Sequence, residues 1–410
     1  MKVLFLSGAH SPYWIGGGSR VACILRSALS ERGMDIHSAW FPHDGVNTPS
    51  VNMFTNNAHA NMFAVNSEIV RLYRCFIQKN QPNVVITDYD IDLSAFWASV
   101  LSGVPTIAQA MSPWPVCPKA DLFIPTQHTR CEGPNFTCGQ CIARKIEDPR
   151  IRVFSSSLAA QVPFSVLSAI ELRKFRITRS KLSCASAIVS CDTFLKNKMA
   201  QFGYDPEKIH VIYNGVDLNK TKPVSNGRRE KIVLFLAYQT TKHTRAIKGC
   251  DHFVQLARKL KPEFPDVRFL WIGQQQIKGD SFETKPYIRN EQDLQEAFRS
   301  SYLLLLPSLW PETMSYSAQE AMAYGKPVVA YDTGANSETI IHSETGLLAD
   351  WGNIDQLTSH VRSLLLDEKE AKRMGNNARK VAVAKFGIDQ TADEYMRLIE
   401  RVAQASTGSQ

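Results

Sequence analysis

Two glutamates in the stretch PSLWPETMSYSAQEAMAYGKPVV, residues 307–329, have the residue type and spacing to bind a ligand. Glu312 lies in a loop bounded by prolines, and Glu320, eight positions later, falls in a short helix that Gly325 is expected to end. The start of that helix exposes unpaired backbone N–H groups and a partial positive charge, which favour a phosphate. A carboxylate on each side can hold sugar hydroxyls. The stretch therefore predicts a binding site for a nucleotide sugar.

Glu320 also has a purely structural interpretation. Its spacing from Ser317 fits the S-x-x-E pattern of a capping box, in which the glutamate side chain bonds a backbone N–H at the helix start. The two roles are compatible, so Glu320 stays a predicted binding residue.

A basic loop, YQTTKHTRAIKGCDHF, supplies cations that suit the same ligand. Lys248 precedes Gly249 at the entrance of an amphipathic helix, where an ammonium group adds to the helix-terminal anion site. Lys242, His243 and Arg245 are close enough in sequence to assist, although a solvated basic loop is the alternative. The predicted apolar face of this helix consists of Phe253, Leu256, Ala257 and Leu260.

A glycine loop, SPYWIGGGSR, follows the first apolar run of the chain. Gly16, Gly17 and Gly18 allow backbone amides to approach a phosphate or a sugar closely. The loop matches neither GxGxxG nor a Walker A sequence, so ATP is not indicated. A flexible turn is the alternative interpretation.

Four cysteines in a long loop have spacings that suit a metal. Cys117, Cys131, Cys138 and Cys141 end in a CxxC pair, and four thiolates fit tetrahedral zinc. We predict a structural zinc site, with His128 as an alternative ligand and reduced cysteines or a disulfide as alternative states. Four protein ligands leave no open position, so a catalytic metal is not expected here.

A second group of acids, Asp88, Asp90 and Asp92, follows a predicted strand as D-x-D-x-D. An EF-hand would need a glycine and an acid where Leu93 and Ser99 stand. A DxD sequence also occurs in metal-dependent transferases. We interpret these residues instead as loop carboxylates at a strand end that face the acceptor.

The segment ELRKFRITRSK, residues 171–181, has five basic residues and one acid. On a helix, Leu172, Phe175 and Leu182 fall on one side, and most of the basic residues fall opposite. Such a helix can rest on an anionic membrane or guide a lipid-diphosphate acceptor. The alternative is an ordinary amphipathic helix packed on the first domain.

The bulk composition limits the class of protein. A chain of 410 residues with 44% apolar residues predicts two globular domains. No apolar run reaches the length of a membrane-spanning helix, and VLFLS near the start reads as a buried strand rather than a signal peptide. The net charge of +8 favours anionic partners, but no nucleic-acid-binding motif is present. Nine cysteines suit a reduced compartment, so we expect a cytoplasmic protein.

The candidate site residues are positioned by short apolar runs, which alternate with helical stretches along the chain. This pattern predicts parallel sheets covered by helices on both faces. The predicted strands are VLFLS, NVVITD, VPTIAQA, AIVSC and HVIYN in the first series and IVLFLA, VRFLWIG, SYLLLLPS and KPVVAYD in the second. The polar segment 220–231 separates the two series. The fold class is therefore α/β, with two Rossmann-like doubly wound domains facing a cleft, and ligands at the strands' carboxyl ends.

Taken together, these motifs resemble the retaining nucleotide-sugar glycosyltransferases of family 4 (glycosyl transferases group 1), which have the GT-B architecture. The resemblance lies in Lys248-Gly249, in PS…PE with Glu312 and Glu320, in EAMAYGKPVV, and in TGANSE before TGLLAD. It extends to the glycine loop, to VIYNGVD and to the closing helices around ARKVAVAKF, and so covers nearly the whole chain.

The resemblance implies roles for the matching residues. Glu320 would bind the ribose hydroxyls, and Glu312 would contact the transferred sugar. The diphosphate would be held by the Lys248 side chain, the backbone amides of Thr313, Met314 and Ser315, and the loop glycines Gly17 and Gly18. Fixed positive charge near a departing nucleoside diphosphate is then the main catalytic contribution.

Two departures from the family pattern affect the predicted catalytic residues. Relatives usually carry an arginine directly after the strand that IVLFLA represents, whereas this chain has Ala237 and Tyr238, and Arg245 is the predicted substitute. Many relatives also carry a histidine in the first domain where this chain has Met111, followed by Ser112. A thioether offers no acid–base chemistry, but the departing phosphate oxygen can itself take the acceptor's proton.

The sequence therefore predicts a retaining, metal-independent hexosyltransferase, with Glu312, Lys248 and Arg245 as catalytic residues. A UDP-sugar is the expected donor, and a glycan, lipid-linked or small-molecule hydroxyl the expected acceptor. The acceptor side would include Met111, Ser112, Asp88 and Asp90. Predicted domains are 1–218, 230–387 and a C-terminal helix, 388–410, that crosses back to the first domain.

Two further expectations and two alternatives belong to this interpretation. The protein would contact the inner face of a membrane peripherally, and it would require no cofactor for catalysis. One alternative is a nucleotide-sugar-binding protein without turnover. The other is a metal-dependent nucleotide-sugar enzyme that uses Asp88 and Asp90.

Overall fold

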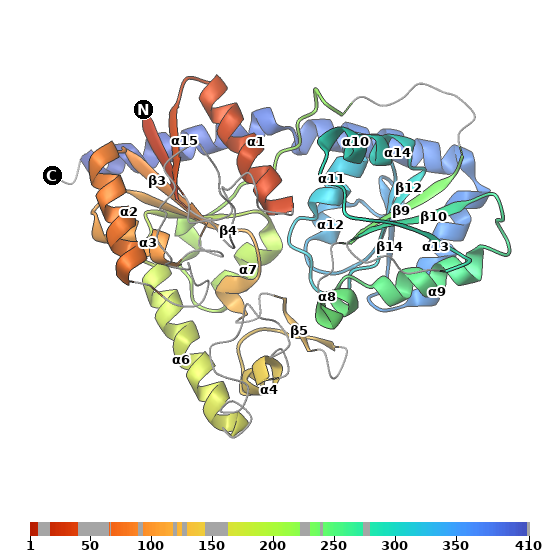
Figure 1. Cartoon of the computed structure of the whole chain (residues 1–410), viewed down its shortest axis with the longest axis horizontal. Helices are drawn as coiled ribbons and strands as arrows, with labels where there is room; N and C mark the ends of the chain where they lie inside the picture. The colour runs from red at the N-terminus through yellow and green to blue at the C-terminus, as the bar shows by residue number, and fades with distance from the viewer. Residues whose placement is uncertain are drawn as a thin grey trace. The chain divides into compact units, whose positions relative to one another are not determined.

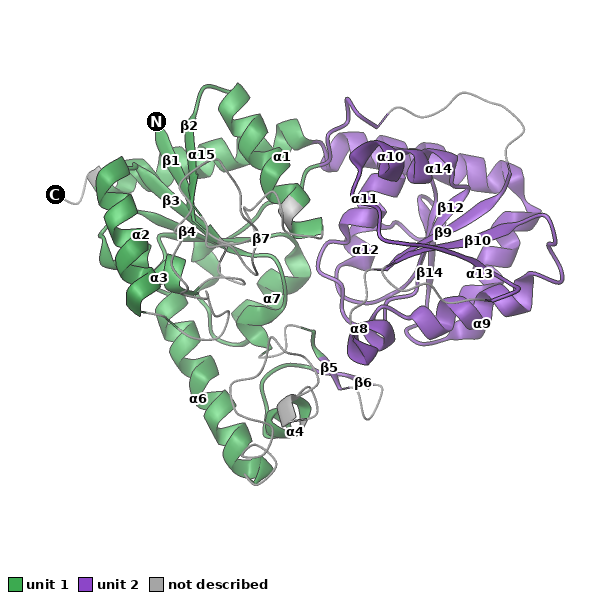
Figure 2. Ribbon diagram, viewed as in Figure 1, with its two compact units in different colours: residues 1–122, 132–215, 388–410 green, residues 123–131, 216–387 purple. Residues whose placement is uncertain are grey.

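A computed structural model describes residues 1–6, 17–39, 65, 67–88, 93–117, 121–124, 129–143, 163–221, 230–237, 241–273 and 279–407. The chain divides into two compact units, each described here by itself (Figure 2). The first unit contains residues 1–122, 132–215 and 388–410, and the second contains residues 123–131 and 216–387.

The first unit is built on one parallel sheet. Its six described strands lie in the order β2-β1-β3-β4-β7-β8 (Figure 1). In this register Val3 pairs with Ile36 on one side and with Val84 on the other. The strands are β1 (Lys2–Leu6), β2 (Asp35–Ala39), β3 (Val84–Asp88), β4 (Thr106–Ala110), β7 (Ala187–Ser190) and β8 (Ile209–Val211).

Side chains alternate along each strand, so the two faces of this sheet carry different helices. Val3 and Phe5 of β1 pack with helices α1 and α15, whereas Leu4 and Leu6 pack with α2 and α3. The helices are α1 (Gly17–Glu31), α2 (Ser67–Asn80), α3 (Leu93–Leu101), α4 (Cys138–Ala143), α6 (Phe164–Leu182), α7 (Thr193–Gln201) and α15 (Ile388–Thr407), with 3-10 turns η2 (Trp114–Val116) and η4 (Pro206–Lys208).

The second unit repeats this architecture with a different strand order. Its six described strands form a parallel sheet in the order β11-β10-β9-β12-β13-β14. They are β9 (Ile232–Ala237), β10 (Arg268–Gly273), β11 (Glu283–Lys285), β12 (Leu303–Leu306), β13 (Val328–Tyr331) and β14 (Gly346–Ala349). The helices are α8 (Lys242–Ile247), α9 (Cys250–Leu260), α10 (Glu291–Ser300), α11 (Tyr316–Ala323), α12 (Asn336–Thr339), α13 (Ile354–Leu366) and α14 (Glu368–Lys385).

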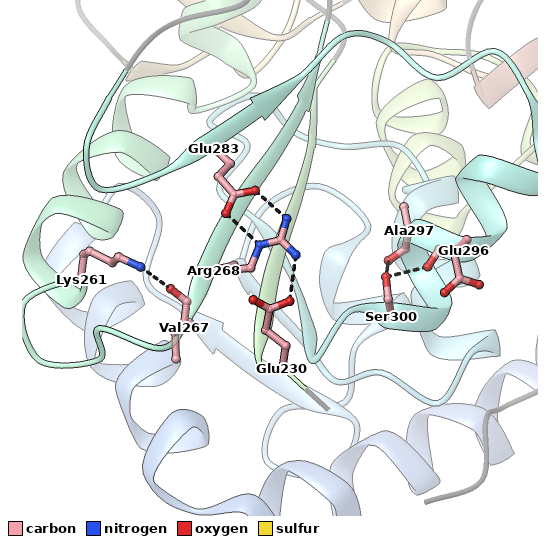
Figure 3. Close-up of polar contacts among 8 residues, drawn as sticks. All are labelled: Glu230, Lys261, Val267, Arg268, Glu283, Glu296, Ala297 and Ser300. Carbon is pink, nitrogen blue, oxygen red and sulfur yellow. Dashed lines mark hydrogen bonds and ion pairs between the residues drawn. The ribbon is translucent and has the colours of Figure 1, made fainter. Parts of the chain in front are cut away.

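An ion-pair network joins three segments at the edge of the second sheet (Figure 3). Arg268 on β10 donates two hydrogen bonds to Glu283 on β11, from Nε at 2.8 Å and from Nη2 at 2.6 Å. Its Nη1 donates to Glu230, just before β9, at 2.8 Å. The pKa of Glu283 is held below its ordinary value of 4.5, because the bidentate hydrogen bond from Arg268 favours the ionised carboxylate.

A short hairpin from the first half of the sequence belongs to the second unit. It consists of β5 (Phe123–Ile124) and β6 (Thr129–Arg130). Phe123 is fully buried in the second unit's core, and Arg130 donates from Nη2 to the Asp332 carbonyl at 2.6 Å. Arg130 also stacks over Trp351, 5.0 Å from the ring centroid. The predicted boundary of 1–218 therefore differs from the observed division, which places residues 123–131 elsewhere.

The predicted fold class is confirmed: each unit is a doubly wound α/β domain with a parallel sheet. Helix α3 (Leu93–Leu101) lies between β3 and β4 in the chain, as the predicted alternation of strands and helices requires. In the described part of the chain, no helix has both the length and the apolar character needed to cross a bilayer.

Candidate active site

The strand order of the second unit locates a binding crevice before any side chain is considered. Chain order reverses between β9 and β12, which are neighbours in the sheet although β10 and β11 come between them in sequence. Ligands of doubly wound folds bind outside the carboxyl ends of the strands at such a switch point. The segments that follow β9 and β12 carry Lys248 and Glu312, respectively.

The Glu312 carboxylate is nearly buried and has two partners on one oxygen. Lys248 Nζ lies 2.9 Å from Oε1, and Ser308 Oγ donates to the same atom at 2.6 Å. The other oxygen, Oε2, has no hydrogen-bond partner among the described residues. The Lys248 ammonium also lies 4.6 Å from the centroid of the Trp310 ring, which is a cation–π arrangement. The site therefore combines a fixed cation with a carboxylate oxygen that can accept a hydrogen bond from a hydroxyl group.

Gly249 allows Lys248 to reach this position. Lys248 is the C-cap of α8, and Gly249 is the N-cap of α9 with φ of +68°. A Cβ at position 249 would lie 1.8 Å from the Pro307 carbonyl oxygen, so only glycine permits this approach of the two loops. The backbone adds a direct bond, because the Leu309 amide donates to the Ile247 carbonyl at 2.8 Å.

The loop after β13 holds the backbone of Glu312. The Ala335 amide donates to the Glu312 carbonyl at 2.7 Å. Gly334 has φ of +60°, and a Cβ there would lie 2.2 Å from the same carbonyl oxygen. In this loop Thr333 Oγ1 and Asn336 Oδ1 are buried without a hydrogen-bond partner among the described residues. Buried polar atoms of this kind are available to a ligand.

Helix α11 begins beside Glu312. Ser315 is its N-cap, and the amides of Met314 and Ser315 have no hydrogen-bond partner within the described ranges. Unpaired amides at a helix start attract anions, as predicted for the diphosphate. The capping-box interpretation is wrong, because Ser317 lies inside the helix rather than at its cap. Glu320 lies on α11 and is 6% exposed.

Arg245, a predicted catalytic residue, forms an ion pair with Asp251. Its guanidinium donates to Asp251 Oδ1, from Nε at 3.0 Å and from Nη2 at 2.6 Å, and lies 5.8 Å from the Trp271 ring centroid. The described residues show no contact between Arg245 and Glu312, so its catalytic role stays a prediction. The neighbouring thiol of Cys250 is no nucleophile, since burial raises its pKa to about 12.

The predicted acceptor-side residues lie in the first unit. Asp88 ends β3 and pairs in register with Gln109 on β4, and Met111 and Ser112 directly follow β4. The Met111 carbonyl accepts a weak hydrogen bond from the Cys191 thiol at 3.9 Å. These positions share the carboxyl edge of the sheet. Asp90 lies outside the described residues.

The loop glycines and the cysteines complete the predicted set. Gly17 and Gly18 are the exposed first residues of α1, and Gly16 and His128 lie outside the described ranges. Within those ranges, which include all four predicted ligands, no group of three or more His, Cys, Asp or Glu side chains is placed to hold a metal. The four ligands are free cysteines, so the disulfide alternative is not observed: Cys117, Cys131, Cys138 and Cys141. The zinc site stays a prediction of the sequence.

Several residues of the site were not singled out from the sequence. Ser308 and Trp310 flank Glu312 in the same loop, and the segment TGANSE was quoted without roles for its residues. Two signals were present: a serine two residues after the end of the buried strand β12, and a glycine three residues after the end of β13. Both are positions where a doubly wound sheet presents residues to a ligand.

The two Rossmann-like units, with a lysine–carboxylate pair at the switch point of the second, define a GT-B glycosyltransferase. The HepE protein of Anabaena, solved in complex with UDP and glucose, has the same fold over 98% of this chain and 100% of that chain, with a TM-score of 0.67 and 16% identity. The chain belongs to glycosyltransferase family 4: residues 15–220 match Glycosyltransferase Family 4, and residues 220–381 match Glycosyl transferases group 1.

Two curated relatives extend the comparison. A mannosyltransferase of Mycolicibacterium hassiacum, MMP alpha-(1->4)-mannosyltransferase, is 30% identical over 50% of this chain and 52% of its own length. The N-acetyl-alpha-D-glucosaminyl L-malate synthase of Bacillus anthracis is 24% identical over 93% of both chains. Several other curated relatives are matched over about two thirds of their own length or less.

Proposed function

We propose that this protein transfers a hexose from a UDP-sugar to a hydroxyl group, with retention of the anomeric configuration and without a catalytic metal. The observation that carries the proposal is the Lys248–Glu312–Ser308 arrangement at the carboxyl ends of β9 and β12. The Lys248 ammonium supplies a cation for the leaving phosphate. The Glu312 carboxylate supplies an oxygen that can accept a hydrogen bond from a hydroxyl of the sugar, and both residues lie in the segments that follow β9 and β12.

The proposed reaction exchanges one bond for another at the anomeric carbon. The bond between this carbon and the diphosphate oxygen breaks, and a bond to the acceptor oxygen forms on the same face. The acceptor's proton passes to the departing phosphate oxygen. Negative charge grows on the diphosphate as the bond breaks, so Lys248 and the amides of Met314 and Ser315 stabilise the transition state more than the ground state.

The two glutamates would divide the donor between them. Glu320, buried on α11, would accept hydrogen bonds from the ribose hydroxyls. Glu312 would use Oε2 for a hydroxyl of the transferred sugar, while Lys248 and Ser308 fix the orientation of the carboxylate through Oε1. A carboxylate held in this way costs no reorganisation when the sugar binds.

UDP as the donor nucleotide is supported by HepE, whose structure contains UDP and glucose. The names of the two relatives point to mannose and N-acetylglucosamine as transferred sugars, and the second name points to malate as an acceptor. For this chain we propose a glycan, lipid-linked or small-molecule hydroxyl acceptor. A cytoplasmic location is supported by its nine cysteines, all of which are free.

The first test is a thermal-shift screen against UDP-, GDP-, ADP- and dTDP-sugars in the presence of EDTA. A ligand at about 100 times its Kd stabilises by about 2.7 kcal/mol, which raises the melting temperature by roughly 5–10 °C. We expect this shift with the UDP series alone. The Glu320→Ala variant should show a smaller shift at the same ligand concentration, and Glu344→Ala, which removes an exposed glutamate, should show the full shift.

Turnover separates the proposed enzyme from its alternatives. Slow hydrolysis of the selected donor, followed by NMR of the released sugar, should give the retained anomer first. Donor binding without any hydrolysis or transfer would favour a binding protein. Activity that EDTA abolishes and manganese restores would favour the metal-dependent alternative with Asp88 and Asp90.

A further inference from the structure

Arg130 lies on the hairpin that the second unit receives from the first half of the sequence (Figure 2). Strand β5 places Phe123 in the core of the second unit, and β6 pairs Arg130 in register with Phe123. Two-stranded hairpins of this length are not stable alone, so the fully buried ring anchors the hairpin to the unit. The exposed Arg130 side chain therefore extends from a fixed backbone.

The Arg130 guanidinium contacts two loops at the carboxyl ends of the strands in the second sheet. Its Nη2 donates at 2.6 Å to the carbonyl of Asp332, the residue directly after β13. Its Cζ lies 5.0 Å from the ring centroid of Trp351, which follows β14. A charged donor strengthens a hydrogen bond, and a guanidinium over an indole ring is a favourable cation–π contact. Arg130 therefore links the loops that follow β13 and β14.

Both of these loops are hydrogen-bonded to the loop that carries Glu312. Trp351 Nε1 donates to the Leu309 carbonyl at 2.8 Å. From the loop after β13, the Ala335 amide donates to the Glu312 carbonyl at 2.7 Å. Leu309 and Glu312 are only three residues apart, so the backbone before the carboxylate is held at two points. Arg130 contacts the segment that supplies each of these bonds.

A structural clamp without any role in the site is the alternative, and another arginine of the second unit illustrates it. Arg373 Nη2 donates to the Ser343 carbonyl at 2.7 Å, and the same guanidinium pairs with Glu370. Ser343 precedes β14, so this clamp lies at the amino ends of the strands, on the opposite edge of the sheet from the site. Both contacts of Arg130 instead lie at the carboxyl edge, where Glu312 is found.

We propose that Arg130 is a positioning residue of the donor site, which acts on the Glu312 carboxylate through the backbone of the loops after β12, β13 and β14. This inference rests on the proposed function, in which Glu312 accepts a hydrogen bond from the transferred sugar. A carboxylate that is already oriented binds the sugar without rearrangement. Arg130 would thus affect the sugar half of the donor, whereas the nucleotide half, assigned to Glu320, would bind without its help.

The first test requires no donor and measures amide hydrogen exchange in full-length wild type, R130M and the matched control R373M. Melting temperatures establish that the variants fold. R130M removes both contacts of the guanidinium, so the amides of Leu309, Asp332 and Ala335 should exchange roughly 3- to 10-fold faster, the effect of losing about one hydrogen bond. R373M should leave these amides unchanged. Unchanged exchange in R130M, or equal acceleration in R373M, would overturn the proposal.

The second test measures transfer from the UDP-sugar that the thermal-shift screen selects, and calorimetric binding of UDP alone. R130M should lower kcat/KM roughly 10- to 100-fold, the size of effect that a small misplacement of a contacting group produces. The Kd of UDP should stay within about threefold of the wild-type value. R130K keeps a cation that can donate to a carbonyl, so it should recover part of the loss. R373M should react as wild type does.

Two kinetic results would refute the positioning role. One is a kcat/KM of R130M within about threefold of wild type. The other is an equal weakening of UDP and of the UDP-sugar, which would place Arg130 on the diphosphate instead. Absence of transfer by the wild-type protein would refute the proposed function, and hydrogen exchange would still decide whether Arg130 fixes these loops.

Discussion

Replacing Lys248 by methionine separates the charge of this residue from its volume. The Glu312 side chain is 6% exposed and the Lys248 side chain 29%. Breaking a fully buried ion pair costs about 3–5 kcal/mol. Partial exposure of the lysine and the remaining Ser308 bond reduce this to about 1–3 kcal/mol, so the melting temperature should fall by roughly 3–10 °C. Loss of a preorganised donor on the leaving phosphate should also lower kcat/KM about 100- to 1000-fold.

The control is Lys259→Met, which removes another lysine in an ion pair. Lys259 Nζ lies 2.5 Å from Asp355, but the two side chains are 47% and 81% exposed. Exposed pairs contribute about 0–1 kcal/mol, so this variant should melt and react much as wild type does. Thermal denaturation and initial rates with the donor found by the screen measure both effects. Equal melting of K248M and wild type, with kcat/KM within about threefold, would refute the reasoning.

Three other perturbations test separate features of the second unit. Glu320→Ala should weaken UDP binding by about 1–3 kcal/mol in calorimetry, because a buried charged partner of the ribose is lost, and unchanged affinity would remove its assigned role. Gly249→Ala should destabilise far more than Gly352→Ala in urea denaturation. Both residues have positive φ, but only position 249 has atoms within 4 Å of the added Cβ. Similar urea midpoints for the two variants would contradict this explanation. The depressed pKa of Glu283 means that its bond to Arg268 stabilises fully above pH 4.5 and is lost as the pH falls lower. Glu283→Gln should therefore lower stability near neutral pH and reduce its decline toward pH ~3.5, whereas an unchanged acid profile would count against the assigned pair.

The sequence predicted those parts of the fold whose signal is continuous and apolar. Central strands such as IVLFLA are buried on both faces and coincide with β9. The edge strands β2 and β11 were not singled out, because DIHSA and ETK are mostly polar and partly exposed. The two-residue strands of the hairpin at 123–131 are too short for any periodicity, so its place in the second unit was missed.

The candidate site was predictable where a residue type implies its own chemistry. Lys248 and Glu312 were assigned to one site, and the structure places their charged atoms 2.9 Å apart. Side-chain pairing decided the rest. Arg245 binds the nearby Asp251, which no motif marked. The apparent S-x-x-E box disappears because α11 begins one residue before Ser317, with Ser315 as its N-cap.

The division of the chain into units has a consequence for its synthesis. Helix α15 fills one side of the first sheet with apolar residues of its inner face: Ile388, Ala392, Tyr395, Leu398, Ile399 and Val402. A ribosome makes these residues after the whole of 216–387. The second unit, with its hairpin already made, can therefore complete its core while the earlier sheet still waits for its last helix. Folding in vivo should follow this order, the reverse of the usual N-terminal-first sequence of domains.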